Sequence, residues 1–263
     1  MAMYAEILQS FESMNVLEVS IYAGVFVALM TSFGSLFAVF TKKLKHRSFE
    51  LSLSFAAGVM IVASFTSLIL PAIEYSKSFL PVGIGILLGV ILIDVINRLV
   101  PHEHLVKGYE GPKEMKGKLK VAWLIVLAVI IHNFPEGLAV GTSLVYSVSV
   151  GLVTALAIGI QDIPEGTLVS LPLTSIQKKR TIPILMGVLS GIAEGLMVVV
   201  GALFFNYFKW FLPYGLSLAG GAMLYVTVKE MIPEIYGKEK DETLITLGFF
   251  LGFYVMLFLD SML

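Results

Sequence analysis

The sequence predicts an all-α, polytopic membrane protein, and three observations carry this prediction. The 263-residue chain is 57% hydrophobic and only 14% charged, whereas soluble domains carry about 25% charged residues. Its mean hydropathy is +0.89. Its apolar residues gather in eight segments, each close to the ~20 residues that a helix needs to cross a bilayer. We therefore expect a single transmembrane domain, residues 1–263, with eight transmembrane helices.

The predicted spans follow one another along the whole chain. They cover Val19–Phe40, Leu51–Tyr75, Phe79–Asn97, Val121–Tyr146, Val148–Ile176, Pro183–Tyr207, Trp210–Ile235 and Thr243–Leu259. Spans four and five are separated by Ser147 alone, so they must form an antiparallel hairpin. An even number of spans places both termini on the same side of the membrane.

The basic residues predict which side that is. Fifteen of the 18 Lys and Arg residues lie in the connections one–two, three–four, five–six and seven–eight. Cytoplasmic loops carry such an excess, so we expect both termini outside a cell (inner or plasma) membrane. Residues 1–18 hold no Lys or Arg and thus lack the basic start of a signal peptide. Because the positions of the basic residues are explained by membrane topology, we do not expect nucleic acid as a partner.

The longest connection, residues 98–120, is polar and rich in Gly and Lys. We expect it to be a flexible cytoplasmic loop. It contains Pro101-His102-Glu103-His104, in which two imidazoles and a carboxylate could hold a metal ion loosely. A plain solvated loop is the alternative, and the sequence leaves both open.

One polar motif is written twice inside the apolar spans. Span four contains His132-Asn133-Phe134-Pro135-Glu136-Gly137, and span five contains Gln161-Asp162-Ile163-Pro164-Glu165-Gly166. Span six adds Glu194, followed by Gly195. Ionisable side chains at such positions are costly in a membrane and are usually functional. The chain has no Cys, which excludes thiolate metal sites and disulfides.

Helical spacing gathers these side chains. Residues three and four positions apart share a helix face, so His132 and Asn133 lie beside Glu136, and the same holds for the second motif. Glu136, Glu165 and Glu194 follow one another at intervals of 29 residues. Three antiparallel helices therefore bring their carboxylates to one depth, near the middle of the membrane.

The charge of this group predicts a cationic ligand. Glu136, Asp162, Glu165 and Glu194 lie in three spans that hold no Lys or Arg. Buried carboxylates must be protonated or held by cations. Two divalent ions would neutralise the set, and so would one divalent ion with two protons. The imidazole of His132 favours zinc, iron or manganese over magnesium and calcium, which prefer all-oxygen sites.

The prolines and glycines of the motif also fit an ion site. Pro135 and Pro164 remove backbone hydrogen bonds and favour the interrupted helices found at the ion sites of many transporters. Gly137 and Gly166 allow neighbouring helices to approach closely. In the alternative interpretation, the Pro-Gly pairs only kink packed helices and the acids are satisfied by Ser and Thr.

These paired signatures resemble those of the ZIP (Zrt-, Irt-like protein) family of divalent metal transporters, especially its bacterial members. The resemblance covers essentially the whole chain. It implies a bundle with spans four and five at its centre and a binuclear metal site in mid-membrane. One ion would be held by Met60, His132, Glu136, Gln161 and Glu165. The second would be held by Asn133, Asp162 and Glu194, with Glu136 and Glu165 bridging. Met60 rests on the resemblance alone, since a buried Met most often serves packing.

The resemblance also suggests residues along the path of the ion. Glu74 and Asp260 lie at the outer ends of spans two and eight, where an entrance is expected. Asp94, Glu230 and Glu234 lie near the inner ends of spans three and seven, where an exit is expected. The alternative for each of these span-end acids is an ordinary interfacial residue. His102, Glu103 and His104 of the loop are the cytoplasmic candidates. Lys229 departs from the pattern, because relatives often have a ligand-type residue before the matching Glu. The family and the small-residue helix faces also make a homodimer plausible.

The expected function is therefore transport of divalent transition-metal ions into the cytoplasm, with zinc as the first choice of ion. No enzymatic activity is expected. A carrier that prefers manganese or iron is the nearest alternative, since the same ligands accept all three ions. An intramembrane zinc hydrolase would need an open water position and a general base, yet this chain offers one mid-membrane histidine where such enzymes offer two or three. A metal-free structural bundle would leave four carboxylates unneutralised.

Overall fold

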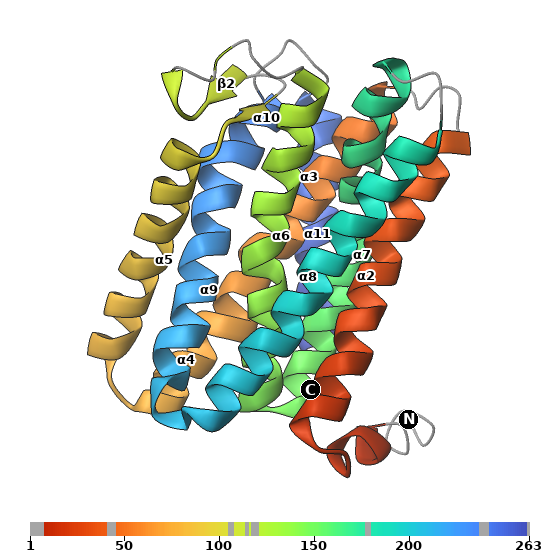
Figure 1. Cartoon of the computed structure of the whole chain (residues 1–263). Coiled ribbons are helices and arrows are strands. Elements are labelled where there is room, and N and C mark those ends of the chain that lie inside the picture. Colours follow the sequence, from red (N-terminus) through yellow and green to blue (C-terminus); the bar gives the residue numbers. More distant parts are fainter. Residues whose placement is uncertain are drawn as a thin grey trace.

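Long helices that run back and forth make up almost the entire protein (Figure 1). The computed structural model describes residues 8–40, 46–104, 108–113, 116, 121–176, 180–236 and 242–261. The elements are α2 (Val16–Phe40), α3 (His46–Ala63), η1 (Ser64–Ile69), α4 (Leu70–Ser76), α5 (Phe79–Leu99), β1 (His102–His104), β2 (Gly108–Glu110), α6 (Val121–Tyr146), α7 (Val148–Ile176), α8 (Thr181–Tyr207), η3 (Lys209–Phe211), α9 (Leu212–Val226), η4 (Thr227–Met231), α10 (Ile232–Tyr236) and α11 (Glu242–Asp260). The positions of the predicted helices are confirmed to within a few residues.

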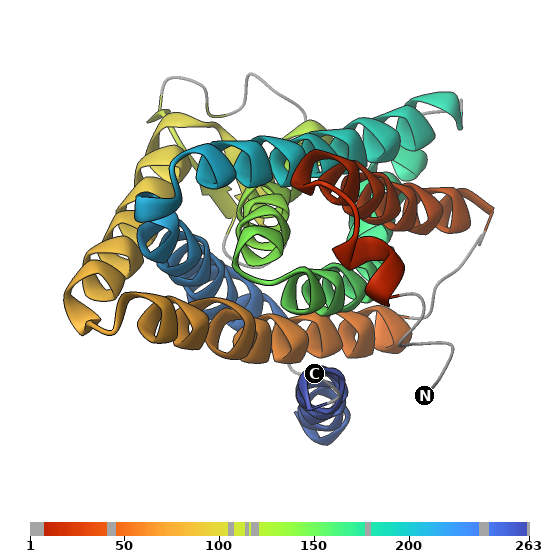
Figure 2. The same ribbon diagram turned by 90° about the horizontal axis from the view of Figure 1, so that it is seen from below.

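Helix α6 stands in the middle of the bundle, as Figure 2 shows along the helix axes. It packs against α7, α8 and α9. Helix α2 packs against α7 and α8, and α5 packs against α9 at the other side. Helix α11 lies outside the ring, against α3 (Figure 2). The helix that carries the first motif is therefore surrounded by protein.

Local chemistry explains where several helices begin and end. Before α2, the Asn15 side chain accepts from the Glu18 amide, and the Glu18 carboxylate accepts from the Asn15 amide, both at 3.0 Å. This reciprocal pair is a capping box. Lys77 adopts a left-handed conformation with φ of 55° and ends α4. Ser78 then accepts from the Leu80 amide and starts α5.

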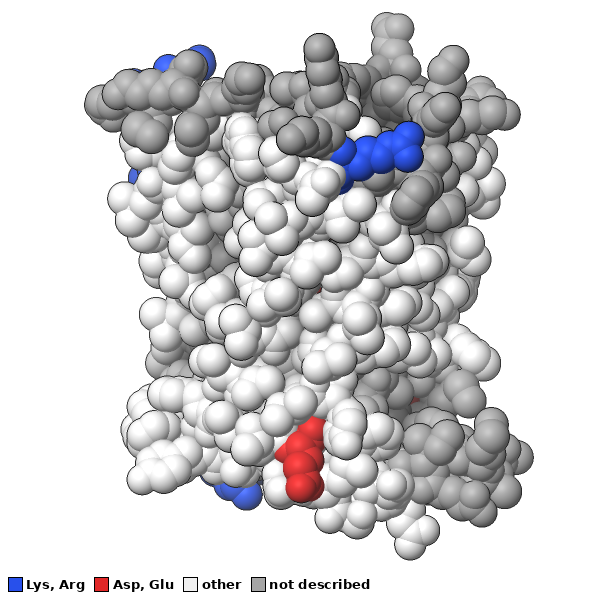
Figure 3. Space-filling view, turned by 45° about the vertical axis from the view of Figure 1, so that its right-hand side comes forward, with Lys and Arg blue, Asp and Glu red and all other residues white. Residues whose placement is uncertain are grey.

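The outer surface fits a lipid environment. Among the described residues, seven helices are long and apolar enough to cross a membrane. Leu29, Leu87 and Leu196 are examples of large apolar side chains that are more than half exposed on α2, α5 and α8. Figure 3 shows a band without charged side chains between the two ends of one face. The protein is thus a multi-pass membrane protein. Helix α6 is not among the seven, so the eight-span topology stays a prediction.

Two expectations about the backbone are wrong. Part of the connection between α5 and α6 is not a flexible loop, because β1 and β2 form an antiparallel hairpin in which His102 pairs with Glu110. Helices α6 and α7 also continue through Pro135 and Pro164 without interruption. The irregular turns lie elsewhere, in the π-helical segments η1 and η4. Such π-helical turns frequently occur at functional sites.

Candidate metal centre

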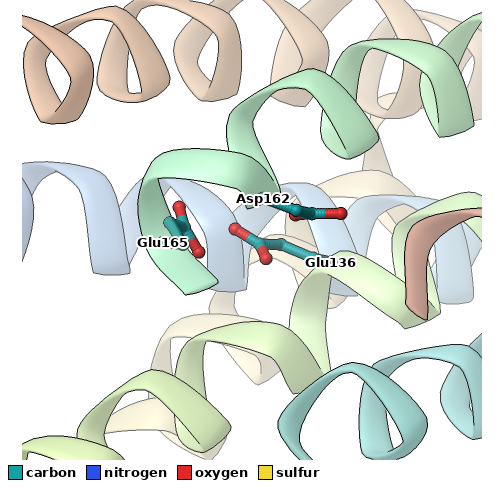
Figure 4. A group of neighbouring side chains, drawn as sticks. All are labelled: Glu136, Asp162 and Glu165. Carbon is teal, nitrogen blue, oxygen red and sulfur yellow. The ribbon is translucent and has the colours of Figure 1, made fainter. Parts of the chain in front are cut away.

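Three carboxylates meet in the interior, between α6 and α7. Glu136, Asp162 and Glu165 each offer an oxygen, and these oxygens lie within 4.8 Å of one another (Figure 4). All three side chains are buried. Gln161 donates its amide Nε2 to Glu136 Oε1 at 2.8 Å, which holds that carboxylate toward α7. The two copies of the motif therefore face one another, as their spacing predicts.

The glycine of each motif permits this convergence. A Cβ atom on Gly137 would lie 2.3 Å from the carbonyl oxygen of Glu194, and one on Gly166 would lie 2.0 Å from that of Thr31. Both distances are far below van der Waals contact, so only glycine lets the backbones approach this closely. As a result α8 lies directly against α6, and α2 lies directly against α7, beside the carboxylates.

Glu194 of α8 reaches the same region through Asn133. Asn133 donates from Nδ2 to Glu194 Oε2 at 3.4 Å and to Ser190 Oγ at 3.2 Å. Thr31 of α2 donates to the same Glu194 oxygen at 2.9 Å. Asn133 and Glu194 are both buried. The structure thus joins these two predicted ligands, with α2 as a support that the sequence did not suggest.

Most of the predicted ligands keep oxygens that no hydrogen bond satisfies. Within the described part of the chain these buried atoms are Asn133 Oδ1, Glu136 Oε2, Gln161 Oε1, Asp162 Oδ1 and Oδ2, Glu165 Oε2 and Glu194 Oε1. Of the four acids, only Glu194 accepts from a Ser or Thr hydroxyl in this part of the chain, which argues against the interpretation that hydroxyls satisfy the group. Buried acceptors without donors are costly. Their convergence forms a site whose chemistry fits cations.

His132 has a partner outside this group. Its Nε2 lies 2.6 Å from Glu230 Oε2, on the π-helical segment η4. Glu230 is buried, and its other oxygen accepts from Asn97 Nδ2 at 2.5 Å. On α6, the imidazole also lies one helical turn before Glu136. His132 therefore stands between the carboxylate group and Glu230, which was expected on the exit path.

Met60 lies beside η4. Its side chain is fully buried, and its sulfur accepts from Thr227 Oγ1 at 3.7 Å. Thr227 is the first residue of η4, the segment that carries Glu230. The thioether thus packs on the same irregular turn that positions the partner of His132.

The predicted entrance acids lie apart from the carboxylate group. Glu74 is exposed and accepts from the Tyr146 hydroxyl at 2.9 Å. Asp260 is half-buried and shares a hydrogen bond with Thr66 of η1. At the other end of the bundle, Asp94 accepts from the Tyr225 hydroxyl at 2.7 Å. The side chains of His104 and Glu234 lie outside the described residues.

The hairpin separates two members of the His-Glu-His sequence, His102 and Glu103. His102 is buried, and its Nδ1 donates to the Val100 carbonyl oxygen at 2.8 Å. Burial lowers the pKa of its imidazole. Its Nε2 lies 4.0 Å from Glu110 Oε2 on β2. Side chains alternate along a strand, so Glu103 points to the opposite face and does not join His102 at a common site.

Two supporting residues were not predicted. Asn97 is a buried amide near the end of α5, and it donates to Glu230. The only sequence signal for this role was its position three residues after Asp94, on the same helix face. Thr31, which holds Glu194, is one hydroxyl in an apolar helix. Such residues commonly bond to their own helix backbone, as Thr31 also does through Val27. Their role depends on which helix packs against them.

Known proteins resemble this chain over most of its length. The family model described as ZIP Zinc transporter matches residues 101–260. The zinc transporter ZIPB of Bordetella bronchiseptica is 34% identical over 89% of this chain and 77% of its own length. The zinc transporter GufA of Myxococcus xanthus is 36% identical over 92% of this chain and 97% of its own length. The zinc transporter ZupT of Streptococcus mutans is 32% identical, over 80% and 85% respectively.

Proposed function

This chain belongs to the ZIP zinc transporter family, and from this premise we propose that it carries divalent transition-metal ions, zinc first, through the membrane into the cytoplasm. Its relatives from three bacteria are named as zinc transporters, which supports the choice of ion. The distribution of Lys and Arg described above predicts the orientation of the protein in the membrane, and the inward direction of transport is part of the proposal.

One observation carries the proposal. Seven buried oxygen atoms on Asn133, Glu136, Gln161, Asp162, Glu165 and Glu194 have no hydrogen-bond partner among the described residues. The three helices that hold these residues contain no Lys or Arg. A group of acceptors at this depth is stable only with protons or metal ions. A transported divalent cation meets this requirement.

We assign the ligands in two sets that share bridging carboxylates. Met60, His132, Glu136, Gln161 and Glu165 would hold one ion. Asn133, Asp162 and Glu194 would hold the second, with Glu136 and Glu165 between the two. Because Glu230 contacts Nε2 of His132, the first ion would either bind the other ring nitrogen, Nδ1, with Glu230 orienting the imidazole, or displace Glu230 from Nε2.

Metal uptake into proteoliposomes tests this function. We expect saturable zinc uptake by the purified chain, and its loss in the double variant Glu136→Gln/Glu165→Gln. Glu12→Gln is the matched control, because it makes the same chemical change at an exposed carboxylate outside the predicted ion path. Parallel assays with manganese and iron(II) identify the preferred ion. Absence of uptake for every ion in the panel would contradict the proposal.

The number of ions is tested separately by anomalous scattering from crystals saturated with zinc. Bridging carboxylates predict two peaks separated by about 3.5–4 Å, as in other two-metal sites. A single isolated peak at saturating zinc would reject the binuclear assignment. Uptake without a second peak would still leave transport through a mononuclear site intact.

A further inference from the structure

An open cleft lies at the end of the bundle opposite the start of α2 and the end of α11. It has a volume of about 440 Å³ and is lined by Asp94, Asn97, Arg98, Glu110, Gly111 and Lys229. These residues come from α5, from the hairpin region and from η4. At its base, Asn97 donates to Glu230, and the second oxygen of Glu230 contacts His132. Two hydrogen bonds thus connect the cleft with the candidate metal centre.

Lys229 lines this cleft together with two acids. Its Nζ lies 3.7 Å from Asp94 Oδ1 on α5 and 3.5 Å from Glu110 Oε2 on β2. It also donates to the Tyr225 hydroxyl at 2.5 Å and lies over the Tyr225 ring, 4.8 Å from the centroid. The ammonium group therefore stands between two carboxylates that come from separate elements.

Arg98 does not share this position. Its guanidinium contacts Asp94 alone of the two acids, one turn along the same helix, at 2.7 Å. Its side chain is 76% exposed, compared with 35% for Lys229. Both cations balance the two acids in number, but of the described cations only Lys229 lies within ion-pair distance of both. Arg98 and Lys229 thus each contribute one positive charge to the cleft, but they lie differently with respect to the two acids.

We propose that Lys229 is a built-in counter-ion that determines how weakly this cleft holds a divalent ion. Asp94, Glu110 and the Tyr225 hydroxyl present oxygen atoms, which are suitable ligands for divalent cations. The ammonium group donates to the Tyr225 hydroxyl and forms ion pairs with both carboxylates, and its compact charge repels a second cation. An ion released from the metal centre then crosses the cleft without being retained, which efficient conduction requires. This inference rests on the proposed transport function.

Removing the ammonium should convert the cleft into a metal site. We expect purified Lys229→Gln to bind about one more zinc ion per chain than the wild-type protein in equilibrium dialysis, because the two acids would lose their shared cation. Lys229→Arg keeps the charge and should bind as the wild type does. The additional ion should be lost in Lys229→Gln/Asp94→Asn, where one of the two carboxylates is removed.

Arg98→Gln is the control, since it removes the same charge from the same cleft. It should bind no additional zinc. An equal gain in Arg98→Gln would overturn the inference, because net charge alone would then explain the effect. An unchanged count in Lys229→Gln would overturn it as well.

A measurement on the unaltered chain covers the case in which Lys229→Gln does not fold. Anomalous scattering from zinc-saturated wild-type crystals should show no ion between Asp94 and Glu110, and an ion there would reject the proposal. These readouts concern the cleft only. Failure of the transport function would instead appear as absence of zinc at Glu136 and Glu165 and absence of uptake.

Discussion

At the scale of single residues, the most informative contact is the one between His132 and Glu230. The imidazole that was predicted as a metal ligand lies 2.6 Å from a buried carboxylate on η4. Asn97 holds the other oxygen of that carboxylate. The imidazole has two ring nitrogens, so an ion bound at Nδ1 would leave the contact between Nε2 and Glu230 in place. In the proposed site, His132 would connect the bound ion to η4 through its contact with Glu230.

We expect His132→Ala to lower zinc affinity at least about tenfold, a loss comparable to that caused by weakening a metal ligand. This variant also removes a partner of a buried carboxylate, which can destabilise the fold by about 3–5 kcal/mol. His132→Gln separates the two effects, because its amide can still donate to Glu230. Phe134→Ala, at an exposed neighbouring position, is the control. Isothermal titration with zinc makes the comparison, and wild-type affinity in His132→Gln would exclude His132 as a ligand.

Zinc affinity should also depend on pH. Metal ligands must be free of protons, so a neutral His132 and ionised carboxylates are required. Affinity should therefore be highest at about pH 7.5 and fall toward pH 5.5, through the ~6.5 reference pKa of His. His132→Gln should lose the imidazole part of this dependence and keep a carboxylate part.

Measurements at two ionic strengths distinguish protonation of the buried ligands from an effect of surface charge, because salt screens surface charge much more strongly than buried charge. An identical pH slope in His132→Gln and in the wild type would show that the imidazole does not bind the ion.

At the scale of elements, close helix contacts and π-helical turns bring the site together. Gly137 and Gly166 are the points at which α8 and α2 reach the helices of the motif. Segment η4 turns Glu230 inward toward α6 and leaves Lys229 facing the cleft. The prolines of the motif do not interrupt α6 or α7. The irregular geometry is therefore supplied by η1 and η4, outside the paired motifs.

Gly166→Ala should destabilise the protein by about 1–3 kcal/mol, the usual cost of overpacking a close contact. The added Cβ would lie 2.0 Å from the Thr31 carbonyl oxygen, so α2 must move away from α7. Gly83→Ala is the matched control, since its Cβ would meet only the flexible Phe79 side chain, at 3.1 Å. Thermal unfolding in detergent measures both. Equal unfolding temperatures for the two variants would contradict this account of the motif glycine.

At the scale of the whole molecule, a central helix is surrounded by others whose outer faces are apolar. Helix α6 lies inside the bundle (Figure 2), and α2, α5, α8 and α11 present large apolar side chains outward. Helix α2 begins and α11 ends at the same end of the bundle (Figure 1). This arrangement fits an even number of crossings. The cleft around Lys229 lies at the opposite end.

The membrane topology can be tested by labelling single introduced cysteines, because the chain has no Cys of its own that would react. We expect Ser10→Cys and Ser261→Cys to react with an impermeant maleimide applied to intact cells, since the positive-inside rule places both ends outside. Lys116→Cys, in the connection between α5 and α6, should react only after the membrane is permeabilised. The reverse pattern would invert the predicted orientation, and labelling of only one end would exclude an even number of spans.

Hydropathy and spacing alone were enough to locate the helices and to choose the residues around Glu136 and Glu165, because both depend on local periodicity and on the high cost of charge in a membrane. The partners of these residues could not be derived in this way. His132 and Glu230 are 98 positions apart, and their contact depends on how α6 packs beside η4. The same holds for Lys229, whose ammonium meets acids on α5 and β2. Such contacts arise only when distant helices pack together, since a side chain's sequence position does not show which neighbour it will reach.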